Sequence, residues 1–457
     1  MSIQSKYADE RDQSSIVDAK QRKKFSNSLN WFFLRTKLFW GLGILILVGV
    51  LTSPLSSKGN NIFLSIGNLS DILRQVSVTG IVAVGMTLVI LTAGIDLSVG
   101  SMLALGTVVC AMLLTQDGWT AASYFGVPAS GAIVFLSALF VFNFLSKLRK
   151  SDSGGKFGVH SRRAIFGHGS RVPLLSSAIV AGIVMWWLAF QVPEKFGVIA
   201  VLVAVPCIGA VMGSINGALV VYGRLQPFIV TLAMMVSALG LARVIAGQDT
   251  AVYPVYTGTN ATEHFEVLRT LVWGIVPVPG LFFLSILAVF FFVAKFTTYG
   301  NYLTAIGGNE EAARFAGINV DRTKIVTYAI SGFLAALAGV LYVAQFRQGK
   351  PDAGLGLELD AIAAVVIGGT SLMGGKGSII GTMVGVLIFG FLSNILQLNN
   401  IDSNTQLILK GIIIVSAVLI QEGQLNRFFS AIHSRLRREE TSGPVSSIHG
   451  ARDRRGG

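Results

Sequence analysis

The chain is dominated by long apolar runs that are separated by short polar segments. Most of these runs approach the roughly 20 residues that an α-helix needs to cross the hydrocarbon core of a bilayer. Hydrophobic residues make up 52% of the chain and charged residues 13%, so the apolar side chains exceed what one soluble core could bury. We therefore expect an all-α polytopic membrane protein. The expected spans are 31–51, 72–92, 96–115, 128–146, 173–191, 197–221, 227–246, 276–294, 323–345, 359–373, 378–398 and 405–421.

The basic residues are distributed unevenly along this series of spans. With the N-terminus inside, the predicted inner segments hold 28 of the 36 Lys and Arg residues. The predicted outer segments hold five. The net charge of +13 therefore follows the positive-inside rule, with both termini cytoplasmic. Nucleic-acid binding has no aromatic or motif support in the sequence.

Composition also predicts how the chain divides. Residues 1–30 are polar and should form a cytoplasmic tail, 31–422 a transmembrane domain, and 423–457 a basic cytoplasmic tail. Within the transmembrane domain, residues 118–195 contain two apolar runs around a basic loop rich in glycine and serine. Two passes leave every later segment on its original side. We therefore interpret 118–195 as a hairpin inserted into a core of about ten spans.

The cysteines and histidines provide no catalytic or metal site. Cys110 and Cys207 fall inside apolar runs, where a thiol usually acts as a small hydrophobic group. The chain has five histidines, and none lies deep in an expected span. We predict no catalytic residue and no metal ligand in this chain.

A polar island, residues 298–324, separates two of the apolar runs. Asn309 is a suitable N-cap, and Glu310 and Glu311 place negative charge at the positive end of a helix. Ala312 and Ala313 favour helix, and Gly317 is suited to end it after about two turns. The island is therefore predicted to carry a short, rigid helix outside the bilayer.

An acidic residue interrupts the apolar region between residues 72 and 115. Asp96 and Ser98 lie in a break bounded by Gly94 and Gly100. Irregular backbone at membrane depth is tolerated where it lines a cavity or is buried in protein, so these four residues are candidates for a translocation path. Alternatively, Asp96 caps the following helix and accepts hydrogen bonds from N–H groups near Ser98 and Val99.

A second acidic pair precedes a glycine-rich segment. Glu358 and Asp360 could line the path or cap a helix, and the sequence leaves both roles open. The segment around Lys376 is not a phosphate-binding loop, because Gly377 stands where Ser or Thr is required and Thr370 where the first glycine is required. We find no ATP site in the chain.

Several segments together resemble one family. GMTLVILTAGIDLSVGS, GAVMGSINGALVVYGRLQPFIVTLAMM, the glycine-rich segment after Asp360 and the polar island resemble bacterial ABC importer permeases for ribose, xylose, arabinose or galactosides. These belong to the branched-chain amino acid/ribose-type permease family. The resemblance covers roughly 70–120 and 200–422, and leaves out the tails and the 118–195 insertion.

This resemblance implies a function and a set of partners. The chain would be the membrane subunit of an importer in the bacterial inner membrane, with a second permease copy or a close paralogue beside it. A solute-binding protein would deliver a pentose or hexose from outside. A separate cytoplasmic ATPase would use ATP, and this chain would bind no cofactor. The polar island would be the coupling loop that docks on the ATPase, through Gly308, Asn309, Glu310, Glu311, Ala312, Ala313 and Gly317.

Three alternatives compete with this interpretation. An ion-coupled secondary transporter would use Asp96, Arg243 and Asp360 as a relay, but charge-poor spans suit an uncharged solute. A membrane-embedded enzyme would need a nucleophile and base, or a metal cluster, at one interface. Within the family, the solute could also be a nucleoside or a branched-chain amino acid.

Overall fold

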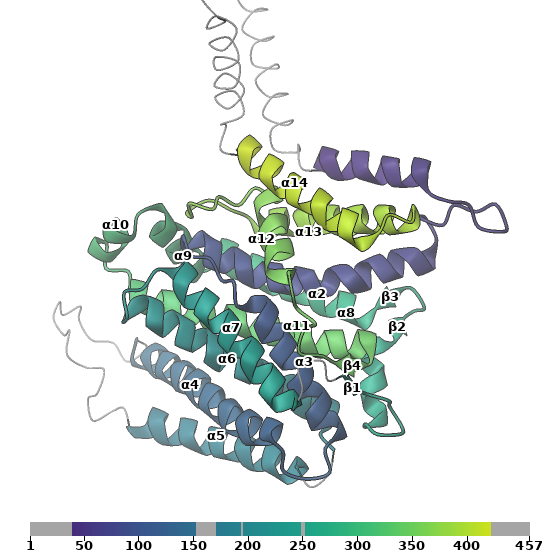
Figure 1. Ribbon diagram of the computed structural model, residues 1–457. Helices are drawn as coiled ribbons and strands as arrows, with labels where there is room; N and C mark the ends of the chain where they lie inside the picture. Colours follow the sequence, from purple (N-terminus) through teal and green to yellow (C-terminus); the bar gives the residue numbers. More distant parts are fainter. Residues whose placement is uncertain (1–38, 152–170, 193–194, 248–251, 422–457) are drawn as a thin grey trace, which may run out of the picture. The chain divides into compact units, whose positions relative to one another are not determined.

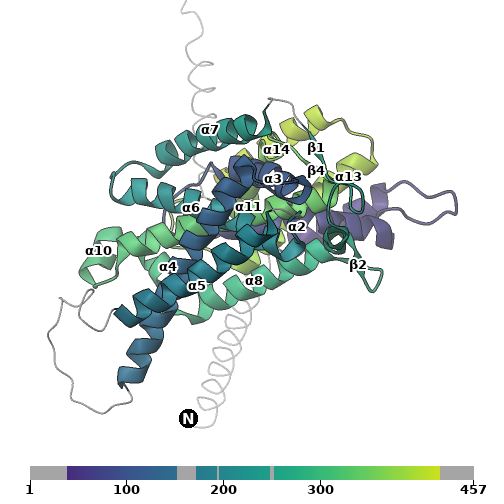
Figure 2. The ribbon, with the colours of Figure 1, turned by 90° about the horizontal axis from the view of Figure 1, so that it is seen from below.

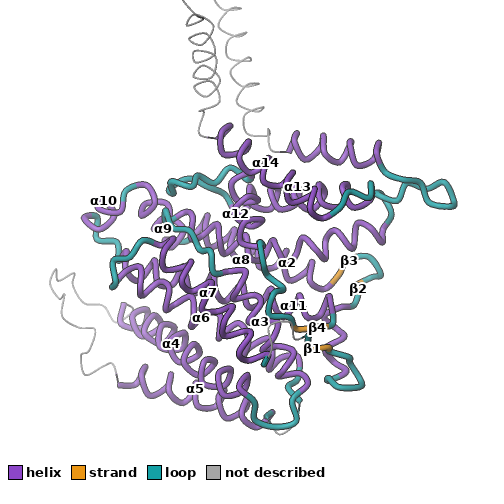
Figure 3. Tube along the Cα trace, in the orientation of Figure 1, coloured by secondary structure: helices purple, strands orange, loops and turns teal. Residues whose placement is uncertain are grey.

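The computed structural model describes residues 39–151, 171–192, 195–247 and 252–421. Helices dominate these residues, and the strands are two residues long (Figure 3). An apolar helix, Phe39–Thr52, comes first. The following helices are α2 (Ile66–Leu91), α3 (Val99–Thr115), α4 (Ala121–Ser151), α5 (Arg171–Gln191), α6 (Val198–Val221), α7 (Pro227–Ala246), α8 (Val278–Phe296), α9 (Thr298–Gly308), α10 (Glu310–Phe315), α11 (Val320–Phe346), α12 (Leu357–Ile367), α13 (Ile379–Leu398) and α14 (Ser403–Gln421).

The chain divides into two units, one ending at Asp402 and the other beginning at Ser403. In the first unit, α11 is the central helix and packs against α6, α3 and α2 (Figures 1 and 2). Its long buried stretch is rich in alanine, glycine and leucine, which suits close packing between helices in lipid. The second unit is described through α14 alone, a helix of 19 residues.

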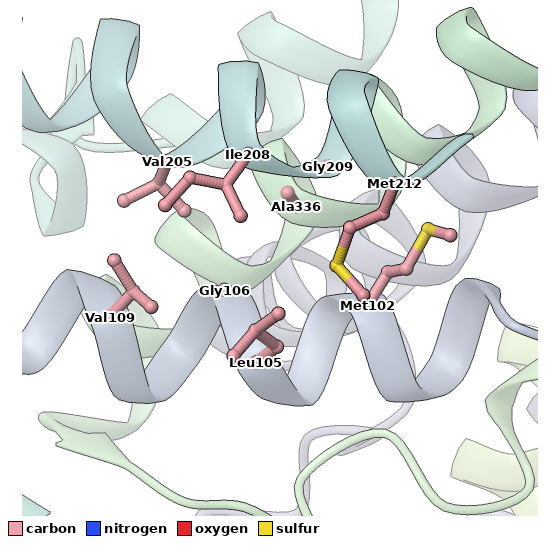
Figure 4. A pocket seen from close by; sticks show the side chains of 9 residues that line it. All are labelled: Met102, Leu105, Gly106, Val109, Val205, Ile208, Gly209, Met212 and Ala336. Atoms are coloured by element: carbon pink, nitrogen blue, oxygen red, sulfur yellow. The ribbon is translucent and has the colours of Figure 1, made fainter. Parts of the chain in front are cut away.

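Small residues let the backbones of α6 and α11 approach closely. A Cβ placed on Gly209 would lie 2.1 Å from the carbonyl oxygen of Gly332, so neither helix tolerates a side chain there. Alongside this contact, α3 and α6 face each other across Ala336 of α11 (Figure 4). The facing side chains are apolar and include Met102 and Met212, and the seam has no room for a water molecule. The seam is therefore a dry, closely packed contact between α3, α6 and α11.

The described helices fit a membrane protein. Seven are long and apolar enough to cross a bilayer, namely α2, α6, α7, α8, α11, α13 and Ala121–Leu139 of α4. The three shorter apolar helices are Phe39–Thr52, α3 and Leu175–Gln191 within α5. These helices coincide with most of the expected spans.

The expected span 359–373 is not a crossing helix. The structure has α12 there, with 11 residues, followed by turns up to Ser378. At 1.5 Å per residue such a helix covers roughly 17 Å, about half of the hydrocarbon thickness. Gly369, at positive φ, interrupts the apolar run, and Gly374 and Gly375, also at positive φ, follow directly after it, which explains why a continuous helix does not form.

The 118–195 segment forms a pair of helices, and the start of α4 and the end of α5 are buried in the main core. α4 packs on α5 and also on α6. Ala122, Leu188 and Val192 are fully buried in the same apolar cluster as Leu113 and Ala204. The basic loop of this segment, 152–170, lies outside the described residues, as do the two predicted tails.

The short strands lie at the opposite end of α11 from α10 (Figures 1 and 3). β1 (Tyr253–Pro254) pairs antiparallel with β4 (Gln348–Gly349), and β2 (Leu271–Val272) pairs antiparallel with β3 (Val276–Pro277). Between β1 and β2 runs a 3-10 helix, η1 (Glu263–Arg269). These elements connect the long polar segment between α7 and α8 to the C-terminal end of α11.

Candidate functional site

The break predicted around Asp96 separates α2 from α3. α2 ends at Leu91, and α3 begins at Val99. The left-handed residue at the turn is Ala93, with φ of 59°, and the N–H of Gly94 donates to the carbonyl of Val89. The left-handed backbone conformation at the break is therefore adopted by Ala93, and not by Gly94 or Gly100 as the sequence suggested.

Asp96 is completely buried and ties three helices together. Its Oδ1 accepts from the backbone N–H of Ser98 at 3.1 Å and from the Ser98 hydroxyl at 2.5 Å. Its Oδ2 accepts from the Ser331 hydroxyl of α11 at 2.8 Å. Asn216 of α6 in turn donates its amide N–H to Ser98 Oγ at 2.9 Å. The carboxylate thus hydrogen-bonds the backbone at the start of α3. It also links α3 to α11 directly and to α6 through Ser98.

Two further polar groups lie in this buried region. The hydroxyl of Tyr328, on α11, would lie 2.6 Å from a Cβ on Gly94. This hydroxyl and Asn216 Oδ1 have no hydrogen-bond partner among the described residues. Thr231 of α7 donates to the carbonyl of Ile95 at 3.3 Å, which attaches a fourth helix to the break. The region is therefore polar and densely packed.

The second acidic pair lies beside the same break. The N-terminus of α12 packs on the first turn of α3, where a Cβ on Gly100 would lie 2.3 Å from the carbonyl oxygen of Gly354 and 2.2 Å from Glu358 Oε2. Glu358 Oε1 accepts from the N–H of Gly356 at 3.3 Å. Glu358 and Asp360 are half-buried, whereas Gly94, Asp96, Ser98 and Gly100 are buried. Gly100 is required because another backbone approaches it.

The polar island carries two helices. α9 covers its first part, which was not predicted to be helical, and α10 follows immediately. Asn309 caps α10 as expected, with its side chain accepting from the N–H of Ala312 at 2.9 Å. Gly317 has φ of 84°, and its N–H bonds the carbonyl of Arg314 just beyond the helix. Helix α10 has six residues and is therefore shorter than the predicted two turns.

An ion-pair cluster holds α10 on the start of α11. Glu310 accepts from Lys324 Nζ at 2.6 Å and from Arg314 at 3.1 Å, and Arg314 also donates to Asp321 at 2.5 Å. Partial burial raises the pKa of Glu310, but the hydrogen bonds and positive charge of Lys324 and Arg314 outweigh burial and lower it below 4.5. Glu310 therefore stabilises α10 mainly through its ion pairs with Lys324 and Arg314, and also through its negative charge at the start of the helix.

The outer face of α10 has no partner within the described chain. Phe315 is 90% exposed, and Glu311 and Ala312 are exposed beside it, whereas Ala313 packs inward. We call α9 and α10 together the knob. An aromatic side chain on such a polar, charged segment is typical of an anchor for another protein. Sequence reasoning missed Phe315, although an aromatic residue in a polar segment was a signal that could have found it.

Backbone contacts connect the knob to the break. A Cβ on Gly307, in the last turn of α9, would lie 1.9 Å from the carbonyl oxygen of Leu91. The N–H of Gly375 donates to the same carbonyl at 3.1 Å, and a Cβ on Gly374 would lie 2.7 Å from the nitrogen of Ala93. Motion of α9 and α10 would therefore act directly on the end of α2, a few residues before Asp96.

The structure brings Glu358 against Gly100, although the two residues are far apart in sequence. Asp96 and Ser98 lie in the same break as Gly100, while the residues predicted to contact the ATPase lie on a separate surface that is connected to the break through Gly307. Sequence reasoning did not find Asn216 or Ser331, because single polar residues in small-residue helices carry no pattern. Their role appears only when α3, α6 and α11 are placed side by side.

A family model described as "Branched-chain amino acid transport system / permease component" matches residues 68–152 and 161–418. The match includes α4 and α5, so the expected interruption of the family resemblance over 118–195 is wrong. Only residues 153–160 within that segment fall outside the match.

Curated relatives extend this finding over most of the chain. The ribose import permease protein of Escherichia coli (strain K12) is 37% identical over 383 residues, covering 82% of this chain and 92% of the relative. The ribose import permease protein of Bacillus subtilis (strain 168) is 35% identical, covering 84% and 91%. The xylose transport system permease protein of Escherichia coli (strain K12) is 32% identical, covering 80% and 87%. No solved structure matches the chain.

Proposed function

The chain belongs to the permease family of branched-chain amino acid transport systems, and on that premise we propose that it is the membrane subunit of an ABC importer for a monosaccharide. The observation that carries this proposal is its identity of 32 to 37% with ribose and xylose permeases over most of their length. The apolar spans support an uncharged solute, since an ion pathway would place several charges at mid-membrane.

The partners follow from the same function. A separate ATPase subunit uses ATP on the cytoplasmic side, and a solute-binding protein delivers the sugar on the other side. Two permease copies, identical or paralogous, enclose the path in the bacterial inner membrane, with both termini cytoplasmic. This chain needs no cofactor of its own, because the energy comes from the partner.

The ATPase docks on α10. Phe315 supplies an apolar anchor, and the exposed charges around it supply a polar rim, which is the arrangement of a binding hot spot. The ion pairs of Glu310 hold α10 rigid, and Gly307 passes its movement to the end of α2. Phe315→Ala should reduce co-purification of the ATPase about tenfold or more. Phe292→Ala, on the exposed side of α8, is the control and should not.

The path runs along the face where α3 and α12 begin. Glu358 and Asp360, which keep partial exposure, offer acceptors to sugar hydroxyls between the two permease copies. The buried residues Gly94, Asp96, Ser98 and Gly100 shape this face from behind. Asp96 then contributes by holding the break together through Ser98 and Ser331, whose hydroxyls it accepts from.

The test is uptake of labelled ribose and xylose into proteoliposomes that contain the permease, its ATPase and its binding protein. Uptake should require ATP on the side of the membrane that carries the ATPase. It should persist when proton and sodium gradients are collapsed. Uptake driven by an ion gradient without the ATPase would instead identify a secondary transporter. Transport of a nucleoside or a branched-chain amino acid, with neither sugar carried, would assign the chain to another branch of its family.

A further inference from the structure

A polar pocket of about 570 Å³ lies beside the knob. One wall is the turn between α6 and α7, with Arg224 and Leu225. The opposite wall is formed by α10 and the first turns of α11. Because one pocket includes both walls, Arg224 lies on the same side of the membrane as α10.

The charges of this pocket do not cancel. The four charged residues of the opposite wall, Glu310, Arg314, Asp321 and Lys324, are joined in one network of ion pairs and sum to zero. Arg224 makes no hydrogen bond or ion pair with any residue that the structure describes. The pocket therefore carries one net positive charge, supplied by a guanidinium without a partner in the described chain.

The backbone at Arg224 is also unusual. Its φ is 52°, in the left-handed region, although residues with a Cβ pay roughly 1 kcal/mol or more there. Glycine would fit this turn without strain, and Gly223 stands immediately before it. An arginine that occupies a strained turn and lines a charged pocket points to a role for its side chain.

We propose that this pocket receives the carboxylate of an acidic side chain from the ATPase subunit, bound by Arg224. The inference rests on the proposed function and adds a second contact to the one made by α10. One carboxylate matches the single net charge, whereas a phosphate monoester would bring a second negative charge close to Glu310 and Asp321. The wall is continuous with the exposed knob that carries Phe315, so one protein can cover both.

The test uses the full permease co-expressed with its ATPase and purified in nanodiscs. Arg224→Gly removes the guanidinium and suits the left-handed backbone, so it should fold at least as well as the wild type. Arg224→Glu reverses the charge. Lys376→Glu is the matched control, since Lys376 is an exposed basic residue of another loop and does not line the pocket.

Both Arg224 variants should weaken ATPase association about tenfold, corresponding to a lost charged contact of about 1.4 kcal/mol. The wild-type affinity should fall as salt rises, and Arg224→Gly should flatten that dependence. In the Arg224→Glu background, acidic residues of the ATPase should be replaced by lysine one at a time, and one of these replacements should restore binding.

Wild-type association in Arg224→Gly and Arg224→Glu would overturn the proposal and leave the proposed function intact. So would a loss of co-purifying anionic lipid with unchanged ATPase binding, which would assign the pocket to a lipid headgroup. Equal weakening by Lys376→Glu would reduce the effect to general charge and would also overturn the proposal. A wild-type chain that retains no ATPase at all would overturn both the pocket proposal and the proposed function.

Discussion

At the residue scale, the most informative side chain is Asp96. Its carboxylate accepts three hydrogen bonds, two from Ser98 and one from Ser331. Asp96→Asn keeps an acceptor oxygen and the shape, whereas Asp96→Leu leaves these donors without a partner at about 1 to 3 kcal/mol each. We expect Asn to retain much more sugar uptake than Leu at equal membrane abundance. If Asn were as inactive as Leu while both folded, a titrating proton relay would explain the residue better.

Glu310 predicts a pH dependence of the knob. Its pKa lies below the ordinary value of 4.5, because Lys324 and Arg314 favour the charged form more than burial opposes it. A lowered pKa stabilises the folded knob above pH 4.5, and that contribution is lost as the pH falls through the lower folded value. Amide hydrogen exchange of α9 and α10, corrected for intrinsic rates, should therefore accelerate in acid. In Glu310→Gln the exchange should be faster at neutral pH and nearly independent of pH, and an unchanged acid response there would point to another group.

At the scale of elements, the contact between α9 and α2 can be tested with two neighbouring glycines. A Cβ on Gly307 would lie 1.9 Å from the Leu91 carbonyl oxygen, while a Cβ on Gly308 meets nothing within 4 Å. Both are in the last turn of α9, so alanine gives both a similar gain in helix propensity. Gly307→Ala should cost about 1 to 3 kcal/mol through overpacking and should impair ATP-driven uptake. Gly308→Ala should behave as the wild type in thermal unfolding, and equal destabilisation by the two variants would contradict this contact.

At the scale of the whole molecule, one apolar core includes the helices of the 118–195 segment. Ala122, Leu188 and Val192 share a cluster with Leu113 of α3 and Ala204 of α6. Deleting 118–195 should therefore expose this core and cause loss of the protein from the membrane, and not the tolerated deletion that an added hairpin would predict. Deleting 153–160, which lies outside the family match, should leave abundance and uptake close to wild type. Membrane abundance by immunoblot decides, and full abundance of the larger deletion would restore the view of a separable hairpin.

The sequence by itself determined the features that depend on neighbouring residues. The apolar runs predicted the helices, since the period and length of a span are local properties. Asn309 and Gly317 predicted the ends of α10, because caps act within one turn of the backbone. The position of the break after Leu91 also followed from local chemistry, although the left-handed residue proved to be Ala93.

Only the tertiary structure decided which distant groups meet. Ser331 reaches Asp96 across 235 positions, and Glu358 settles on Gly100, because α11 and α12 pack against α3. Such pairings depend on helix packing, in which many small residues offer similar contacts, so no sequence pattern specifies them. The same holds for α12, where the apolar run predicted a span and the glycine turns after it shortened the helix. Arg224 likewise lies in the pocket beside Glu310 because α6 packs beside α11, which the sequence alone does not specify.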